Sequence, residues 1–369
     1  MRTIPHVVCG AIPPHILTRV AAHATGLASD SARATLEHMQ QLESGRAAAT
    51  LLESVPAGAP PSGDARPRKR RCVYDADHQF VLPGQLAMSE HGPRNTDVEV
   101  TEAYDGSGTT CDFFWRVFGR ASIDGKGMRL DSTVRYGTSF GNALWNGRQM
   151  VYGHADGRLF TRFTAFVDVI AHELTHGITQ HTAGLGYYGE TGALNEHVSD
   201  AFGSMVKQFL LGQAASESDW LIGAGLFGPA VHGVAVRSLA APGTAYDDPV
   251  LGRDPQPSHM RDYVHTTDDH GGVHINSGIL NHAFYRASMA LGGKTWEVPG
   301  RIWYVALTDR LNPDADFTDF ARATVDIAGE LYGNGGSVQR IVRDAWSGVG
   351  LSVPLFPQFS RKEKRTHEH

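Results

Sequence analysis

The sequence predicts an α+β protein of two lobes, in which a β-rich N-terminal lobe and an α-helical C-terminal lobe are joined by a central helix. Residues 73–155 combine many Gly turns with aromatic clusters such as Phe113-Phe114-Trp115, which is typical of strands. Residues 158–181 hold closely spaced apolar side chains, with no Pro or Gly before position 177, and predict the central helix. Residues 190–355 carry helical apolar patterns around 280–291, 302–311 and 338–346, which predict the second lobe.

The chain of 369 residues is long enough for two or three domains. We expect an N-terminal extension and linker over residues 1–71, the first lobe with the central helix over 72–180, the second lobe over 181–357 and a polar tail over 358–369. The composition, 41% hydrophobic and 20% charged, is that of an ordinary globular protein.

The run His172-Glu173-Leu174-Thr175-His176 has the spacing of a metal site. Because a helix turns once per 3.6 residues, His172 and His176 lie on one face and can bind one zinc ion. Glu173 can reach a water on that ion and act as its general base. Only three positions of the run are fixed, so a buried helix with two surface histidines is the alternative.

A second run, residues 192–200, supplies what the first one lacks. Catalytic zinc usually has three protein ligands, and Glu196 follows His176 at a distance that allows a loop and a return helix. Asp200 lies on the same helical face as Glu196 and can accept the second N–H of His172, which fixes the tautomer of that ring. An amphipathic helix with acids on its wet face is the alternative, and the two runs together favour the metal site.

With these two runs the chain resembles the thermolysin family of zinc endopeptidases, and more closely its protealysin-like branch, which has a short propeptide. The resemblance extends from about Val73 to Gly350 and includes residues 12–17, Ile-Pro-Pro-His-Ile-Leu. It implies a metalloendopeptidase with a thermolysin-like fold and an active-site cleft between the lobes. It also implies one catalytic Zn²⁺, held by His172, His176 and Glu196.

The resemblance implies how substrate would bind. The Ala143 carbonyl and the Asn142 side chain would hold an extended peptide as an added strand. Residues 141–147 can also be interpreted as a plain turn with Asn-Gly at 146–147. Arg237 would bind a substrate carbonyl on the primed side. The enzyme would cut on the amino side of bulky hydrophobic residues, which would enter a pocket lined by Val169, Val236 and Phe160.

The resemblance also implies the chemistry. Zinc and Glu173 would activate water, and Glu173 would carry the proton to the leaving amine. Zinc, Tyr187 and His274 would stabilise the oxyanion, and Asp269 would orient and charge His274. Tyr188, the neighbour of Tyr187, is the less favoured candidate.

Lys207 departs from the pattern of many secreted relatives, which have an acid there as part of a double calcium site. Asp168 matches another ligand of that site. A hard cation needs several oxygen ligands, and an ammonium repels it and could pair with Asp168 instead. We therefore predict no double Ca²⁺ site. His197, beside the third zinc ligand, points elsewhere in the helix and is interpreted as structural.

Residues 1–71 are interpreted as a propeptide and linker that keep the enzyme latent by occupying its own active-site cleft. Residues 12–17 resemble the proline motif of such propeptides, and residues 31–53 predict a helix with Leu36, Met39 and Leu42 on one face. Residues 54–71, with four prolines and a basic cluster at the end, predict an exposed, cleavable junction.

Cys9 stands near the proline motif, and its thiolate could cap the zinc in the latent form, although the family motif does not require it. The sequence leaves this question open. The three cysteines, Cys9, Cys72 and Cys111, are an odd number at irregular spacing, which indicates no disulfide framework and fits an intracellular protein.

We expect no signal peptide, because Pro5, Pro13 and Pro14 interrupt any apolar run, and no stretch approaches the length of a membrane span. The expectation is a monomer that is cytoplasmic or exported by a non-classical route. Its partners would be peptide or protein substrates, and the resemblance allows a small protein inhibitor. The basic cluster could suggest nucleic acid, but without residues 1–71 the chain has 24 basic and 34 acidic residues, a net charge of −10.

Two other classes of protein stay open. A catalytically silent, zinc-dependent binding protein would keep the ligands and lose Glu173 or the oxyanion donors, and all of these are present. A DNA-associated regulator would need the basic stretch to be folded, and the linker composition argues against that.

Overall fold

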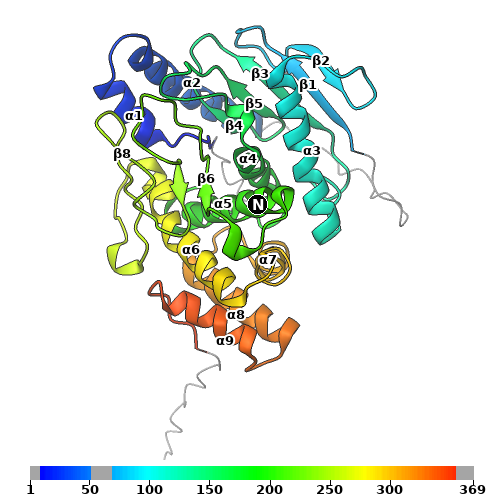
Figure 1. The fold of residues 1–369 in the computed structure, drawn as a ribbon, viewed down its shortest axis with the longest axis vertical. Coiled ribbons are helices and arrows are strands. Elements are labelled where there is room, and N and C mark those ends of the chain that lie inside the picture. Colours follow the sequence, from blue (N-terminus) through cyan, green and yellow to red (C-terminus); the bar gives the residue numbers. More distant parts are fainter. Residues whose placement is uncertain (1–8, 51–68, 355–369) are drawn as a thin grey trace, which may run out of the picture.

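The structure, a computed structural model, describes residues 9–50 and 69–354, with the side chains of 45–50 excepted. The fold has an upper lobe built around a sheet and a lower lobe built from helices, with a central helix between them (Figure 1). The predicted polar tail at 358–369 and nearly all of the predicted junction at 54–71 lie outside the described residues.

The upper lobe contains a five-stranded mixed sheet with the order β2-β1-β3-β5-β4. Strands β1 and β3, and β3 and β5, are parallel, while β2 and β4 join the sheet antiparallel. The strands are β1 (Arg71–Asp75), β2 (Gln85–Ser89), β3 (Leu130–Tyr136), β4 (Ala143–Trp145) and β5 (Met150–Gly153). Because β4 is the last strand, one of its edges is left without a partner in this sheet.

The prediction that residues 73–155 are mostly strands is wrong for α3 (Val98–Phe118). Gly106 and Gly108 give this segment poor helix propensity. Tertiary packing requires them, because a Cβ on Gly106 would lie 2.3 Å from Ile170 Cδ1 and one on Gly108 would lie 2.0 Å from Arg71 Nη1. The aromatic cluster around Phe113 is therefore a buried helix face, packed against the second lobe at Phe202 and Phe209.

The central helix is shorter than predicted. A single 3₁₀ turn, η1 (Phe163–Ala165), precedes α4 (Val167–Gln180), and the residues from 158 onward are not yet helical. Helix α4 packs on both α3 and α5 (Gly189–Leu211), so it is covered by both lobes.

The helical second lobe is confirmed in its main parts. After α5 come α6 (Asp269–Leu291), α7 (Pro299–Val305) with its π-helical continuation η4 (Ala306–Arg310), α8 (Phe317–Tyr332) and α9 (Ser337–Ser347). Between α5 and α6 the chain is mostly loop, with the turns η2 (Ala215–Glu217) and η3 (Met260–Asp262) and the short strands β6 (Leu221–Ile222), β7 (Arg237–Ser238), β8 (Asp247–Asp248) and β9 (Gly252–Arg253). The lobe is therefore mostly helical, as predicted, and the segment between α5 and α6 carries site residues such as Arg237.

The N-terminal extension folds as two helices beside the sheet, α1 (Pro14–His23) and α2 (Leu27–Thr50) (Figure 1). Pro14 is the first residue of α1, a position that tolerates its missing N–H. Met39 is buried, and Leu36 and Leu42 pack against the core, so the predicted apolar face of the second helix is confirmed.

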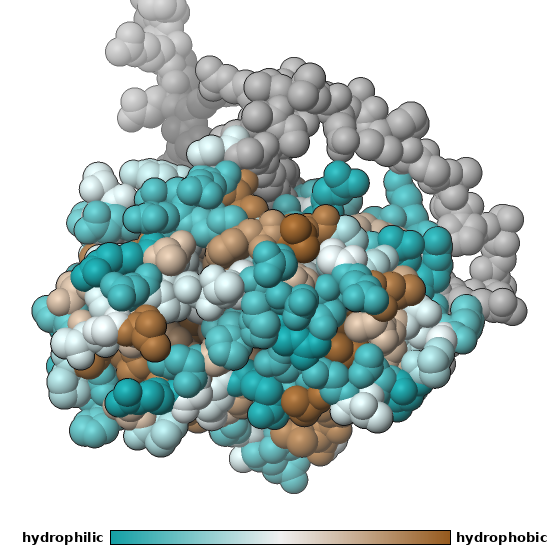
Figure 2. All heavy atoms as spheres, turned by 90° about the horizontal axis from the view of Figure 1, so that it is seen from above, coloured by the Kyte–Doolittle hydropathy of each residue, from teal (hydrophilic) through white to brown (hydrophobic). Residues whose placement is uncertain are grey.

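His197 is a buried structural residue. Its Nδ1 lies 2.8 Å from Asn281 Oδ1, and Trp303 Nε1 donates to its Nε2 at 2.8 Å, which ties α5 to α6 and α7. The face of the molecule in Figure 2 is mostly hydrophilic, with apolar side chains in small scattered groups. Among the described helices, none combines the length and apolar character of a membrane span.

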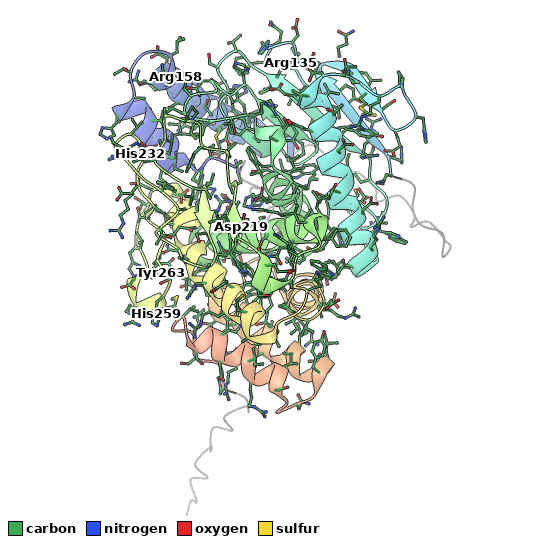
Figure 3. The ribbon with its side chains drawn as sticks, viewed as in Figure 1. Arg135, Arg158, Asp219, His232, His259 and Tyr263 are labelled. Carbon is green, nitrogen blue, oxygen red and sulfur yellow. The ribbon has the colours of Figure 1, made fainter. Side chains whose placement is uncertain are left out.

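Lys207 pairs with Asp168, as predicted, at an Nζ–Oδ2 distance of 3.4 Å. Its ammonium also lies 2.8 Å from Asp219, labelled in Figure 3, and donates to the Leu221 carbonyl at 3.1 Å. Asp168 is buried and accepts a further hydrogen bond from Gly223 N at 3.1 Å. The cation therefore neutralises a carboxylate that burial would otherwise leave unpaired, and the absence of a double calcium site stays a prediction.

We expect Lys207→Ala to lower the free energy of unfolding by about 2–4 kcal/mol, because Asp168 would keep a buried charge without its cation. Urea titration followed by circular dichroism measures this, with and without added CaCl₂, and calcium should not restore the loss. Arg94→Ala is the control, since its ion pair with Asp105 is exposed and should contribute little to stability. Equal losses in the two variants, or rescue by calcium, would contradict this account.

Candidate metal centre and active site

Helices α4 and α5 bring three ligand atoms together. His172 and His176, one turn apart on α4, place their Nε2 atoms 3.1 Å from each other. Glu196 on α5 places Oε2 3.5 Å from His172 Nε2 and Oε1 3.4 Å from His176 Nε2. Gly203 permits this close approach of the helices, because a Cβ there would lie 2.6 Å from the Asp168 carbonyl oxygen.

The geometry of these groups fits a zinc ion. A tetrahedral zinc with bonds of about 2.0–2.1 Å holds nitrogen and oxygen ligands about 3.4 Å apart, close to the distances seen here. Glu196 Oε2 is buried without a hydrogen-bond partner among the described residues, and the two Nε2 atoms face each other. Buried polar atoms without partners are costly, and a cation between them would satisfy all three.

Both histidines are oriented through their second ring nitrogen. His172 Nδ1 lies 2.9 Å from Asp200 Oδ1, as the sequence predicted. His176 Nδ1 lies 3.0 Å from Asn195 Oδ1 and 3.2 Å from Ser199 Oγ. These contacts keep the Nε2 lone pairs directed at the metal position. Burial lowers the pKa of His176 to about 4, so this ring is neutral, as a ligand must be.

Arg237 is held by Asp200 rather than by the metal cluster. Its Nε and Nη2 donate to the two carboxylate oxygens at 2.8 Å each, and Asn281 Nδ2 donates to the same carboxylate at 2.8 Å. Burial by itself would raise the pKa of Asp200, but the Arg237 guanidinium and His172 hold it well below its usual range. The remaining Nη1 group is buried and has no partner among the described residues.

Glu173 is fully buried beside the edge strand. Its Oε2 accepts a hydrogen bond from Trp145 N at 3.0 Å, and its Oε1 has no partner among the described residues. Burial and the neighbouring Glu196 carboxylate raise the pKa of Glu173 well above its usual value. A carboxylate with one oxygen fixed and the other open is suited to moving a proton.

Tyr187, His274 and Asp269 form the opposite side of the cluster. The Tyr187 hydroxyl donates to Glu196 Oε1 and lies 3.3 Å from His274 Nε2. Asp269 Oδ1 lies 2.6 Å from His274 Nδ1, and its Oδ2 accepts the backbone N–H of His274 at 2.9 Å. Burial lowers the pKa of His274, but Asp269 and Glu196 outweigh it and the net shift is upward. Tyr188 is 62% exposed and lies outside this cluster.

The N-terminal segment occupies the edge of β4. Ala11 N donates to the Ala143 carbonyl at 2.8 Å, and Gly10 forms an antiparallel bridge with Leu144. The Asn142 side chain accepts from Ile12 N at 2.8 Å and donates to Ile12 O at 3.0 Å. The segment is therefore bound through its backbone, as an added strand, by both groups that the sequence assigned to substrate.

The three predicted pocket residues, Val169, Val236 and Phe160, are all buried. Phe160 lines a small cavity with Leu17 and Val20 of α1, so it faces the N-terminal segment. A shared role of the three as a substrate pocket stays a prediction.

Several site residues were missed by the sequence reasoning. Trp145 follows Asn142 and Ala143 in the sequence but was not assigned a role, and only the packing of β4 on α4 reveals its contact with Glu173. Asn195 and Ser199 flank Glu196, and helical spacing from the ligand could have suggested them. Asn281 comes from a distant helix, and no sequence pattern connects it with Asp200.

Comparison with known protein families gives two matches that together cover most of the chain. Residues 68–180 match the thermolysin metallopeptidase catalytic domain, and residues 183–351 match the thermolysin metallopeptidase alpha-helical domain. The boundary between them falls where α4 has ended and the loop to α5 begins.

Individual relatives agree with these matches. An extracellular metalloprotease of Pectobacterium carotovorum is 49% identical over 94% of this chain and 97% of its own length. A thermolysin of Alicyclobacillus acidocaldarius is 37% identical over 76% of this chain and 50% of its own length. The precursor of protealysin, a metalloproteinase from Serratia proteamaculans, superposes with a TM-score of 0.84 at 46% identity, covering 93% of this chain and all of that structure.

The expectation of a cytoplasmic protein is wrong. The Pectobacterium relative and a 40% identical protein of Serratia marcescens are named extracellular metalloproteases. An odd set of cysteines does not identify a reducing compartment here, because a chain of this size buries a large enough core to be stable without disulfides.

The two family matches and the relatives identify a metallopeptidase. The convergence of His172, His176 and Glu196 on one point is consistent with that family. The fold, with its sheet-containing first lobe and helical second lobe, is the same in the protealysin precursor. The chain belongs to the thermolysin family of metallopeptidases.

Proposed function

We propose that this chain is the latent precursor of a zinc-dependent neutral endopeptidase that hydrolyses peptide bonds on the amino side of bulky hydrophobic residues. The observation that carries the proposal is the convergence of three metal ligands, a buried carboxylate and two oxyanion donors at one point. The family is zinc-dependent, and zinc bound by His172, His176 and Glu196 would supply Lewis acidity and lower the pKa of a water molecule.

Glu173 acts as the general base in this mechanism. Its Oε2 is held by Trp145 N, and its free Oε1 takes the proton of the attacking water and delivers it to the leaving nitrogen. A pKa raised by burial makes the protonated carboxyl a competent donor in the second half of the reaction.

Tyr187 and His274 donate hydrogen bonds to the oxygen of the cleaved carbonyl as it becomes negative. The hydroxyl and Nε2 lie 3.3 Å apart, so both can reach one oxygen atom. Asp269 holds the Nδ1 proton of His274 and favours the imidazolium form, which leaves Nε2 as a donor.

The substrate binds in an extended conformation along β4, through the Ala143 carbonyl and the Asn142 side chain. The Nη1 group of Arg237 donates to a substrate carbonyl on the primed side. Val169, Val236 and Phe160 accept the hydrophobic side chain that follows the cleaved bond. Since residues 10–12 use the same backbone-binding groups, substrate and N-terminal segment exclude each other, and the enzyme is latent until that segment leaves.

The direct test is a time course of intact mass for the purified precursor beside Glu173→Ala, with bound zinc quantified in each. We expect the wild type to lose its N-terminal segment by cleavage within 54–71. Glu173→Ala should stay whole, with at least about 10³-fold lower activity and equal zinc, because its general base is missing. If both proteins stay whole with one zinc each, self-processing is excluded, and either another protease activates the enzyme or the chain is a zinc-dependent binding protein.

Asp269→Asn should lower kcat/KM about 10- to 100-fold, because His274 loses its negative partner. The carboxylate favours the protonated ring, so its removal lowers the pKa of His274 and moves the alkaline limb of the pH profile to lower pH. Peptide hydrolysis measured across pH tests this. The neighbouring Asp268→Asn is the control, since Asp268 is exposed and should leave the profile in place. An unchanged alkaline limb in Asp269→Asn would remove His274 from the mechanism.

Gly10→Ala should raise the basal peptidase activity of the intact precursor severalfold. A Cβ at this position would lie 2.5 Å from Asn142 Nδ2, so the segment could not keep its place on β4. Activity on a short peptide is measured before any loss of mass. Gly26→Ala is the control for general loosening of the N-terminal helices. The positive φ of Gly26 strains any other residue, but a Cβ there meets nothing within 4 Å. Equal effects in the two variants would rule out the Asn142 contact as the cause.

A further inference from the structure

The N-terminal segment also brings a sulfur atom into the metal cluster. Cys9 Sγ lies 3.0 Å from Glu196 Oε1 and 3.3 Å from His274 Nε2, and the side chain is buried at 4% exposure. The ligand atoms of Cys9, His172, His176 and Glu196 all lie within 4.8 Å of one another. Four candidate ligands therefore surround one point, where a catalytic zinc site has three and an open position.

We propose that Cys9 Sγ is the fourth protein ligand of the zinc ion in the precursor and closes the position that the attacking water needs. The proposal rests on the proposed zinc peptidase function and adds a second cause of latency to the blocked cleft. Release of residues 9–12 from β4 would withdraw the sulfur and open the site.

The chemistry of the four residues fits a closed site. Thiolate, imidazole and carboxylate are all ordinary zinc ligands, and thiolate is the softest and tightest of the three. With a zinc–sulfur bond of about 2.3 Å and zinc–nitrogen bonds of about 2.0 Å, a tetrahedral site separates sulfur from its neighbours by about 3.5 Å. The Cys9 thiol donates to Glu196 Oε1 at 3.0 Å, so the sulfur already lies against one of the ligand oxygens.

The position of Cys9 is fixed by the strand pairing of the next three residues. Gly10 pairs with Leu144, Ala11 donates to the Ala143 carbonyl, and Ile12 bonds twice to Asn142. A slip of one residue would move the sulfur by about 3.3 Å and turn the side chain to the other face of the strand. The contacts on β4 therefore determine which residue meets the metal.

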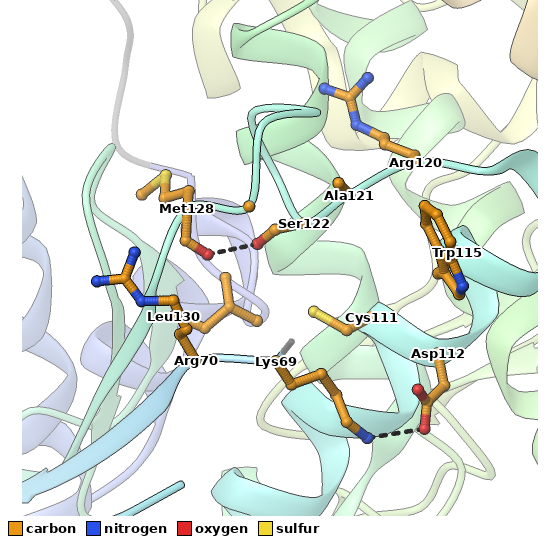
Figure 4. A pocket seen from close by; sticks show the side chains of 11 residues that line it. Lys69, Arg70, Cys111, Asp112, Trp115, Arg120, Ala121, Ser122, Met128 and Leu130 are labelled. Atoms are coloured by element: carbon orange, nitrogen blue, oxygen red, sulfur yellow. Dashed lines mark hydrogen bonds and ion pairs between the residues drawn. The ribbon is translucent and has the colours of Figure 1, made fainter. Parts of the chain in front are cut away.

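The other cysteines provide matched controls. Cys111 on α3 lines a separate small cavity with Lys69, Asp112 and Trp115, and none of the four clustered ligands lines that cavity (Figure 4). Burial raises the pKa of Cys111 to about 11, so its thiol is protonated at neutral pH. Cys72 lies on β1, within the sheet.

The first test uses the precursor with Glu173→Ala, which keeps its N-terminal segment, loaded with one equivalent of Co²⁺ in place of zinc. We expect a sulfur-to-cobalt charge-transfer absorption in the near ultraviolet. Adding Cys9→Ser should abolish this absorption, and adding Cys111→Ser should leave it intact. Absence of the band with cobalt bound, or its survival in the Cys9→Ser protein, would overturn the proposal.

The second test keeps all cysteines and measures alkylation of the same precursor by iodoacetamide. The reagent forms a sulfur–carbon bond and releases iodide and a proton. A sulfur bonded to metal is protected because the metal holds the electron pair that attacks the reagent. Peptide mapping should show alkylation of Cys9 at least about tenfold slower with zinc than without it, and a rate for Cys111 that does not depend on zinc. Equal and measurable rates of alkylation of Cys9 in the two forms would overturn the proposal.

The zinc content separates this proposal from the proposed function. If the precursor binds one zinc and Glu173→Ala stops self-processing, but the band and the protection are absent, only the role of Cys9 is wrong. If the precursor binds no zinc, both proposals fail together.

Discussion

The close packing of α4 against α5 is the constraint on which the active site depends. The candidate zinc ligands come from both helices, and their atoms converge because the backbones approach at Gly203, where a Cβ would lie 2.6 Å from the Asp168 carbonyl oxygen. The same two helices also form the Lys207–Asp168 ion pair, which joins α5 to the first turn of α4. Metal binding, helix packing and the ion pair are thus consequences of one short interhelical distance.

Buried charge is the main energetic problem of this site, and the fold solves it by pairing. Asp200 receives two hydrogen bonds from Arg237, one from Asn281 and a contact from His172 Nδ1, so a fully buried carboxylate stays ionised. Each partner comes from a different element, which makes the network rigid. Removing Asp200 would leave the buried Arg237 guanidinium without its carboxylate partner.

Under the proposed function, the edge of β4 would let one set of groups serve both latency and catalysis. Backbone hydrogen bonds do not depend on side chains, so the Ala143 carbonyl and the Asn142 amide, which bind residues 11 and 12, would bind a substrate in the same way. The N-terminal segment adds the covalent advantage of a tethered ligand, whose effective concentration is high until the connecting chain is cut. Specificity for a substrate must then come from the side-chain pockets next to this edge.

The sequence by itself determined the family and the general architecture. It also predicted the candidate ligands, because His172, Glu173, His176, Glu196 and Asp200 obey helical spacing, which is a local property. It failed for α3, where glycines that weaken a helix are required by contacts with Ile170 and Arg71, residues distant in the sequence. It also left open the role of Cys9, assigned none to Trp145, and could not connect Asn281 with Asp200. Those contacts join segments separated by tens to hundreds of residues, and only tertiary structure decided them, because no local periodicity encodes a distance between strands and helices.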